Sequence, residues 1–170
     1  MIYNNITETI GHTPLVRINN IDEDMAEILV KVESFNPGGS IKDRPALYMI
    51  MDAEQKGLLN PGDTIIEATS GNMGIALSMI GAAGGYKVKI VMPDTMSIER
   101  RRIMTAYGAE LILTEGKLGM KGSVDMAEKL AKENNYFLTR QFSNDANRLA
   151  HIETTAKEIV KDTGGKLDAF

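Results

Sequence analysis

The chain has 170 residues, of which 43% are hydrophobic and 25% charged, and its formal net charge is −4 at pH 7. This size and composition are typical of a folded globular domain and exclude an intrinsically disordered chain. The negative charge argues against nucleic acid and anionic membranes as partners, and the lack of cysteine excludes disulfides and thiolate chemistry.

The first half of the chain alternates between predicted strands and predicted helices. A β-branched run at 26–33 predicts a strand that ends in an Asn-Pro-Gly-Gly turn. Apolar residues at helical spacing predict a helix over 45–56, with Pro45 at its first position and Arg44 held outside helical geometry. The next predicted elements are a strand at 63–68, a helix at 73–83 and a strand at 87–93.

The second half continues the alternation. Its predicted elements are a helix at 97–108, a strand at 109–114, a helix at 120–134, a strand at 136–142, a helix at 149–161 and the beginning of a strand at 166–170. Strands alternating with helices of this length predict an α/β fold, a three-layer sandwich with a parallel sheet and helices on both faces. Ligands bind at loops that leave the carboxyl ends of such strands, and both Lys42 and residues 69–72 are expected on loops of this kind.

The sequence offers little sign of a targeting segment or of a metal site. The N-terminal segment has no basic start and no long apolar core, which argues against a signal peptide. The longest apolar run, GIALSMIGAAGG, is too short and too rich in glycine to span a bilayer. The two histidines, His12 and His151, are far apart in the sequence, which argues against a histidine metal site. We therefore expect a cytoplasmic protein with no metal and no membrane partner.

One lysine, Lys42, stands between a glycine-rich turn and the start of a predicted helix, in the stretch SFNPGGSIKDRP. Glycines permit positive φ and close approach of the backbone to a ligand. The positive potential at a helix start favours the neutral amine, which is the form that makes a Schiff base. By itself the pattern leaves open a solvated turn lysine, which is the commoner case.

Residues 69–72, Thr-Ser-Gly-Asn, connect a predicted strand to a helix of small residues. Exposed N–H groups at the helix start, with the hydroxyls of Thr69 and Ser70, suit a carboxylate, and the Asn72 amide can donate to a phenolate-like oxygen. An ordinary helix cap explains this loop equally well. Gln141 ends the predicted strand 136–142, so its amide is expected at the same edge of the sheet.

Together these stretches resemble the β-family, or fold type II, of pyridoxal-phosphate enzymes, and specifically its cysteine synthases (O-acetylserine sulfhydrylases). The segments that look like the family's successive signatures are ETIGHTPLVRI, SFNPGGSIKDRPA, EATSGNMGIAL, MPDTMSIERRRIMTAYGAELILT and QFSNDANRLAHIETTAKEI. They occur in the family's order and at its spacing, and they cover nearly the whole chain. The solvated turn lysine thereby becomes the minor interpretation.

The resemblance implies a cofactor, a reaction and a set of site residues. Lys42 would bind pyridoxal 5'-phosphate covalently and act as the catalytic general base, and Asn72 would hydrogen-bond the ring hydroxyl oxygen of the cofactor. The residues that would bind the substrate α-carboxylate are Thr69, Ser70, Gly71 and Gln141. The implied reaction is β-replacement on O-acetyl-L-serine by sulfide, which gives L-cysteine through an aminoacrylate intermediate, in a homodimer.

One residue departs from the family pattern. Met73 stands where family members typically carry threonine. A thioether cannot donate a hydrogen bond, so one polar contact in the substrate-binding loop is lost. Our hypothesis is an altered substrate preference at Met73, with the cofactor retained.

The resemblance also implies a two-domain fold. Residues 45–144 would form a smaller substrate-loop domain, and residues 1–44 and 145–170 would belong to a larger cofactor domain. The second half of that larger domain, which supplies the phosphate loop and the partner of the pyridine nitrogen in the family, is absent from these residues. We therefore expect an incomplete chain whose exposed sheet edge and apolar face need a partner segment.

Other functions stay open on the sequence. Cystathionine β-synthase activity, or release of sulfide from cysteine with lanthionine formation, uses the same cofactor chemistry with another nucleophile. A truncated, non-catalytic binding or regulatory module is a third candidate. A nucleotide-binding Rossmann-like domain is disfavoured because no G-x-G-x-x-G follows the first predicted strand.

Overall fold

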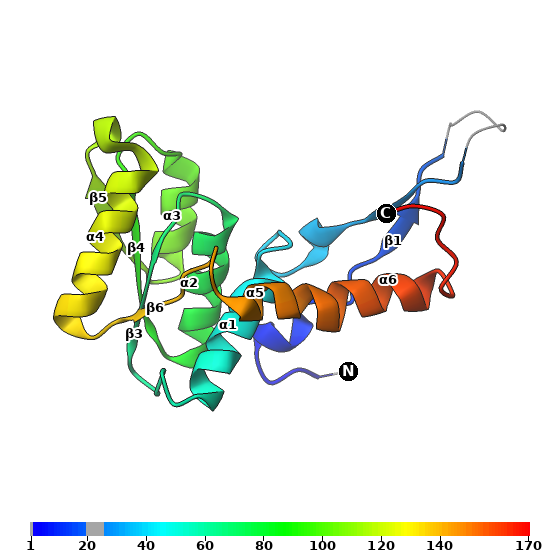
Figure 1. The fold of residues 1–170 in the computed structure, drawn as a ribbon, viewed down its shortest axis with the longest axis horizontal. Coiled ribbons are helices and arrows are strands. Elements are labelled where there is room, and N and C mark those ends of the chain that lie inside the picture. The colour runs from blue at the N-terminus through cyan, green and yellow to red at the C-terminus, as the bar shows by residue number, and fades with distance from the viewer. Residues whose placement is uncertain (1, 20–25) are drawn as a thin grey trace.

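The structure is a computed structural model that describes residues 2–19 and 26–170. Figure 1 shows two regions. We call one the sandwich, which consists of the parallel sheet and helices α1 to α4. We call the other the arm, which consists of strands β1 and β2 and the helical segments η4 and α6 beside them.

The sandwich is built on a four-stranded parallel sheet with the strand order β5-β4-β3-β6. Its strands are β3 (Thr64–Ala68), β4 (Lys87–Pro93), β5 (Glu110–Thr114) and β6 (Phe137–Leu138). The strands predicted at 63–68, 87–93 and 109–114 are confirmed. The strand predicted at 136–142 is shortened to two residues, because Arg140 has a φ of 53° and turns the chain away from the sheet.

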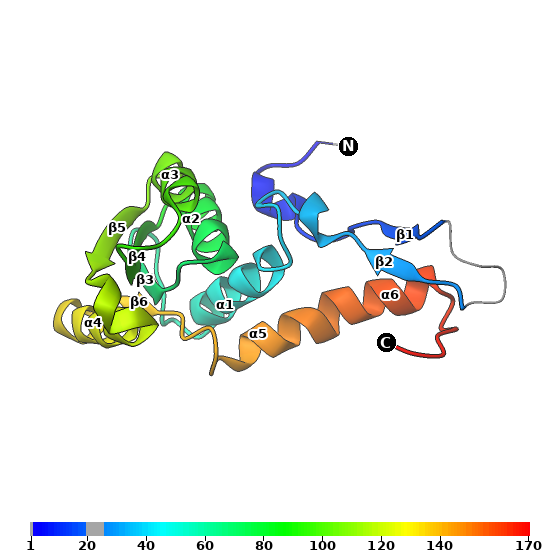
Figure 2. The same ribbon diagram turned by 90° about the horizontal axis from the view of Figure 1, so that it is seen from above.

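Helices cover both faces of this sheet. On one face lie α1 (Asp43–Gln55), α2 (Asn72–Gly84) and α3 (Ile98–Ala106), and on the other lies α4 (Gly119–Asn134). Neighbouring strand residues point to opposite faces, so Ile65 enters the first core and Ile66 the second. Figure 2 shows the layers from above, with α4 on the side opposite α2 and α3. The predicted three-layer α/β architecture is confirmed.

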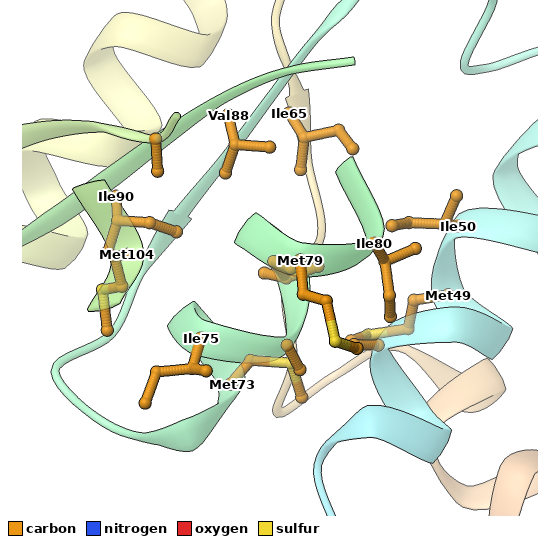
Figure 3. Packing of buried hydrophobic residues seen from close by; sticks show 14 of the residues in the cluster. Met49, Ile50, Ile65, Met73, Ile75, Met79, Ile80, Val88, Ile90 and Met104 are labelled. Carbon is orange, nitrogen blue, oxygen red and sulfur yellow. The ribbon is translucent and has the colours of Figure 1, made fainter. Parts of the chain in front are cut away.

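The larger core lies between the sheet and helices α1 and α2. In Figure 3, Ile65 and Val88 of the sheet point toward α2, while Met49 of α1 approaches α2 from the side. Helix α2 is buried along most of its length because its residues are small or apolar. It ends at Gly84, and the next residue, Gly85, has a left-handed φ of 74°. Gly81 lets α2 approach β4, since a Cβ there would lie 2.2 Å from a methyl group of Val88.

The start of α1 differs from the prediction. The helix begins at Asp43, so Arg44 is helical and Pro45 is the third helical residue. The expectation that Pro45 would exclude Arg44 from the helix is wrong. Proline is tolerated at this position because first-turn N–H groups have no intrahelical acceptor. Arg44 is held by ion pairs to Glu33 and Glu158, which outweigh the preference of a residue before proline for extended geometry.

The arm contains an antiparallel pair of strands, β1 (Leu15–Arg17) and β2 (Leu29–Lys31). The strand predicted at 26–33 is therefore three residues long, and β1 was not predicted. Because β2 does not belong to the parallel sheet, the expectation that Lys42 follows a parallel strand is wrong. Short 3-10 turns, η1 (Ile6–Thr9) and η2 (Glu33–Phe35), flank the pair, and η3 (Gly116–Leu118) precedes α4.

One long helical segment joins the sandwich to the arm. It consists of α5 (Asp145–Ala150), the π-helical turn η4 (His151–Thr155) and α6 (Ala156–Asp162), so the helix predicted at 149–161 begins earlier. The strand predicted at 166–170 is not formed. A strand needs a neighbour for its N–H and C=O groups, and within the described residues none pairs with this segment.

Large apolar side chains are exposed along and near this helix. Phe142 is 93% exposed, and Leu149, Ile152 and Val160 are between 44% and 54% exposed. The expected need for a partner segment, like the domain boundaries expected at residues 44 and 144, stays a prediction. Among the described residues no helix is both long and apolar enough to cross a membrane, and no group of three acidic, histidine or cysteine side chains is placed to hold a metal ion.

Candidate active site

Lys42 lies directly before α1, at the end of the glycine-rich turn. It is half-buried, and its backbone N–H donates to the hydroxyl of Ser40 at 3.1 Å. Gly39 has a left-handed φ of 79°, which explains the glycine at that place. Gly38 lies against Asp43, and a Cβ on Gly38 would come within 2.5 Å of the Asp43 carboxylate. The turn that presents Lys42 therefore depends on both glycines.

Asp43 clamps this turn from inside. Its side chain is fully buried, and Oδ2 accepts a hydrogen bond from the N–H of Gly38. Burial raises the pKa of Asp43 to about 6, assisted by the negative charge of Glu33 and opposed by the Gly38 bond. Oδ1 has no hydrogen-bond partner within the described residues. The residue next to Lys42 is thus a carboxyl group that keeps its proton below about pH 6.

Arg44 fixes the first turn of α1 to the arm. Only 1% of its side chain is exposed, and its guanidinium pairs with Glu33 at 2.8 Å and with Glu158 at 2.6 Å. Burial alone would raise the pKa of Glu158, but hydrogen bonds from Arg44, Lys31 and the N–H of His12 lower it to about 2. The helix start that carries Lys42 is therefore held in one orientation.

His151 lies in the electric field of Lys42. Burial lowers the pKa of His151, and the charges of Lys42 and Arg44 lower it further, against the opposing effect of Glu33. One ring nitrogen, Nδ1, is 3.1 Å from the hydroxyl of Thr155. Burial and the charges of Lys42 and Arg44 thus favour the neutral form of His151. Sequence reasoning treated it as structural, because nothing in its local spacing shows that α5 packs against α1.

Residues 69–72 form the loop between β3 and α2, as predicted. Thr69 is buried, and its N–H donates to the carbonyl of Val91 at 3.0 Å, which ties the loop to β4. The N–H of Gly71 donates to Oγ1 of Thr69 at 3.2 Å, and the carbonyl of Ser70 accepts from Arg100 of α3 at 3.3 Å. Asn72 opens α2 with an exposed side chain. The loop is thereby anchored to two elements, β4 and α3.

Open space lies over this loop. A Cβ on Gly71 would meet no atom within 4 Å. Helix α2 begins at Asn72, and no side chain caps its first turn. The N–H of Gly74 donates to the carbonyl of Gly71 at 3.1 Å, whereas the N–H groups of Asn72 and Met73 precede the first intrahelical acceptors. These are the features of a site for an anionic ligand, and Lys42 and Asn72 stand at the starts of two helices, α1 and α2, that pack together.

Met73 lies differently from its neighbours in the loop. Its side chain is 2% exposed and belongs to the larger core. Figure 3 shows it among the core side chains below α2. Gly74 beside it lets α2 approach α3, since a Cβ there would lie 2.7 Å from the end of Met104. The hypothesis that Met73 alters substrate preference stays a prediction, and an effect of its side chain would act through packing.

Gln141 lies beyond β6 at the same edge of the sheet as the loop. It is 7% exposed, and its backbone N–H lies 3.4 Å from Oε2 of Glu67, which is two residues before Thr69. Sequence reasoning missed Glu67. A signal was present, because a lone carboxylate interrupts the apolar strand TIIEA.

These residues fit pyridoxal phosphate by their chemistry. A primary amine on a clamped turn can condense with the cofactor's aldehyde, an exposed amide at position 72 can bond to its ring oxygen, and the N–H groups of the loop can hold a carboxylate. The backbone at Gly71 is open, since a Cβ there would meet no atom within 4 Å. The roles of Lys42, Asn72, Gln141 and the loop residues stay predictions.

Comparison with known proteins gives a consistent result. The family model described as pyridoxal-phosphate dependent enzyme matches residues 6–170. Cysteine synthase of Flavobacterium sp. is 56% identical over 99% of this chain and 55% of its own length. O-ureido-L-serine synthase of Streptomyces lavendulae is 54% identical over 99% of this chain and 52% of its own length.

A solved structure extends the likeness to three dimensions. The crystal structure of cysteine synthase from Entamoeba histolytica has a TM-score of 0.94 and 51% identity, and the match covers 99% of this chain and 52% of that one. This chain thus spans about half the length of the relatives that it matches. On the extent of the family match and of these identities, the chain belongs to the family of pyridoxal-phosphate dependent enzymes.

Proposed function

We propose that this chain acts in a pyridoxal-phosphate-dependent β-replacement that makes L-cysteine from O-acetyl-L-serine and sulfide. The observation that supports it most is the arrangement of Lys42 and the 69–72 loop at the starts of two packed helices, α1 and α2. The 56% identity with a cysteine synthase favours the same reaction. A cytoplasmic homodimer is part of the proposal.

Each site residue has a role in this reaction. The cofactor, when bound, supplies the electron sink for the charge left at the substrate α-carbon. Lys42 would hold the cofactor and, once released from it, would take the α-proton as general base. The loop N–H groups with Gln141 bind the substrate carboxylate, and Asn72 bonds to the ring oxygen. Acetate would leave the β-carbon with its bonding electrons, sulfide would add there, and Lys42 would return a proton to the α-carbon.

A second candidate has a different nucleophile and gives O-ureido-L-serine. It is favoured by the 54% identity with O-ureido-L-serine synthase, which is close to the identity with cysteine synthases. Both candidates use the same amine and the same carboxylate site. Product analysis with sulfide and with alternative nucleophiles separates them.

The cofactor assignment is tested by borohydride trapping. The full-length protein is incubated with pyridoxal phosphate, reduced and digested, and the peptides are analysed by mass spectrometry. We expect a yellow protein that bleaches on reduction and carries the label on Lys42. Lys42→Ala should lose the label, whereas Lys56→Ala, which removes an exposed lysine paired with Asp52, should keep it. A protein labelled elsewhere or unlabelled contradicts the proposal.

The reaction is tested by cysteine formation. We expect Lys42→Ala to lower the turnover number at least ~100-fold, the usual contribution of a general acid or base. A wild-type protein that binds the cofactor but forms neither cysteine nor another β-substituted alanine would support the non-catalytic alternative.

A further inference from the structure

Glu67 is a buried carboxylate in the middle of the sandwich. It lies on β3, between β4 and β6, and is 5% exposed. Three donors point at it: the hydroxyl of Thr139, the N–H of Gln141 at 3.4 Å and the N–H of Ala68 at 3.1 Å. Burial raises the pKa of Glu67, and these bonds together with the side-chain amide of Gln141 oppose the increase. A buried charge is costly unless its lone pairs are used, so its presence calls for a reason.

The segment that Glu67 holds is a strained turn. Arg140, between Thr139 and Gln141, has a φ of 53°, which is uncommon for a residue other than glycine. Such a conformation persists only where the surroundings hold it on both sides. Here the amide of Asn144 donates to the carbonyl of Thr139 at 3.0 Å, and the amide of Asn147 donates to the carbonyl of Gln141 at 2.6 Å.

Glu67 also connects the two segments assigned to carboxylate binding. Thr69 follows it by two residues, directly after the end of β3, and the backbone N–H of Gln141 bonds to its side chain from beyond β6. The spacing between the 69–72 loop and Gln141 therefore depends on this side chain. The inference rests on the proposed function, because it is through Gln141 that Glu67 acts.

We propose that Glu67 is a positioning residue of the substrate site: by accepting hydrogen bonds from Thr139 and Gln141, its carboxylate holds the 139–144 turn so that Gln141 can meet the substrate carboxylate beside the 69–72 loop. The isosteric change Glu67→Gln tests this. A glutamine keeps the volume but turns an NH₂ group toward donors, so at least one of these bonds is lost.

The first test needs no cofactor and no turnover. Amide hydrogen exchange is measured on the wild type, on Glu67→Gln and on Glu110→Gln, which removes an exposed carboxylate of β5. We expect Glu67→Gln to lose protection at residues 139–144 and to keep it in β4 and β5, while Glu110→Gln resembles the wild type. Unchanged protection at 139–144 overturns the proposal.

The second test is a double-mutant cycle on the holoenzyme with Glu67→Gln, Gln141→Ala and the double variant. We expect Glu67→Gln to raise KM for O-acetyl-L-serine about tenfold, as for one lost hydrogen bond to a charged group, with kcat nearly unchanged. In the Gln141→Ala background the same change should raise KM no further, because the residue through which it acts is gone.

The two proposals fail separately. A further rise of KM in the double variant, equal to that in the single one, shows that Glu67 does not act through Gln141. If the wild type fails to label Lys42, the proposed function is wrong, whereas the exchange experiment still tests whether Glu67 holds the turn.

Discussion

The sandwich and the arm are stabilised in different ways. In the sandwich, the strands and helices bury apolar side chains on both faces of the sheet. In the arm, β1 and β2 have no fully buried residue, and the contact with the sandwich runs through charged side chains around Arg44. Burial of apolar side chains stabilises a fold strongly but does not depend on direction. Hydrogen-bonded ion pairs fix the orientation of the groups that they join, at a cost in desolvation.

Lys42 lies at the junction of these regions. It precedes a helix whose body belongs to the apolar core and whose first turn belongs to the charged cluster. The backbone that carries Lys42 is thereby held by directional bonds on one side and by a packed helix on the other. Such support from surrounding shells is what a functional group needs to stay in one geometry.

The largest effect is expected from Arg44→Ala. It removes the cation that pairs with Glu33 and leaves the partly buried Glu158 with Lys31 alone. Removing one partner of a buried ion pair costs about 3–5 kcal/mol. The free energy of unfolding from denaturant titration measures this loss. Hydrogen exchange should show it first in β1, β2 and α6, with β3 and β4 still protected.

Arg17→Ala is the matched control for Arg44→Ala. Arg17 lies on β1 and pairs with Glu27 at 3.0 Å, but both side chains are more than half exposed. Exposed ion pairs contribute little to the free energy of unfolding, so this variant should have the same free energy of unfolding as the wild type. An Arg44→Ala protein that loses protection evenly across both regions would contradict the comparison.

Truncating a core side chain in the sandwich should lower hydrogen-exchange protection in the sandwich, whereas Arg44→Ala lowers it first in the arm. Leu77 on α2 is fully buried, and Leu77→Ala should cost about 3 kcal/mol through lost burial and the remaining cavity. Because the core couples helices and sheet, unfolding should stay cooperative and protection should fall throughout the sandwich. Leu118→Ala, at an exposed leucine, should change little. A loss of hydrogen-exchange protection confined to α2 would argue against one core shared by the helices and the sheet.

Two carboxyl groups at the junction should give opposite pH dependences. The pKa of Glu158 is lowered from 4.5 to about 2, so its contribution is present above pH 4.5 and is lost as the pH falls toward 2. The pKa of Asp43 is raised from 3.8 to about 6, so its contribution is present below pH 3.8 and is lost as the pH rises through 6. Unfolding free energies between pH 2 and 8 measure both, and each contribution should amount to about 3 kcal/mol at most.

Neutral amides separate these two contributions. Asp43→Asn should abolish the decrease between pH 4 and 6, and Glu158→Gln should abolish the decrease below pH 4.5. If the free energy of unfolding of Asp43→Asn decreases between pH 4 and 6 as steeply as that of the wild type, another group titrates in this range.

The smallest effect is expected for Glu153→Gln. Glu153 pairs with Lys157 on the same helical segment as Glu158, but both side chains are exposed. Water screens this pair, so the melting temperature should equal that of the wild type, in contrast with Glu158→Gln. A clear decrease would mean that exposed pairs also hold the arm.

Local patterns predicted the sandwich well. The strand Lys87–Pro93 was predicted at its observed bounds, and α2 within one residue of its ends, because periodicity and glycine stops are carried by neighbouring residues. The 69–72 loop was found for the same reason. Glu67 and Arg44 were not interpreted correctly, since their partners lie 72 and 114 residues away in the chain.

By itself the sequence determined the alternation of strands and helices, the layered α/β class and two segments, around Lys42 and residues 69–72, that are suited to covalent and anion chemistry. Only the tertiary structure decided that β2 leaves the parallel sheet for the arm, that Arg44 is helical, that Met73 turns into the core and that Glu67 reaches Gln141. The reason is physical: hydrophobic periodicity acts over a few residues, whereas a buried charge takes the orientation that its partners impose, and those partners are brought to it by the fold.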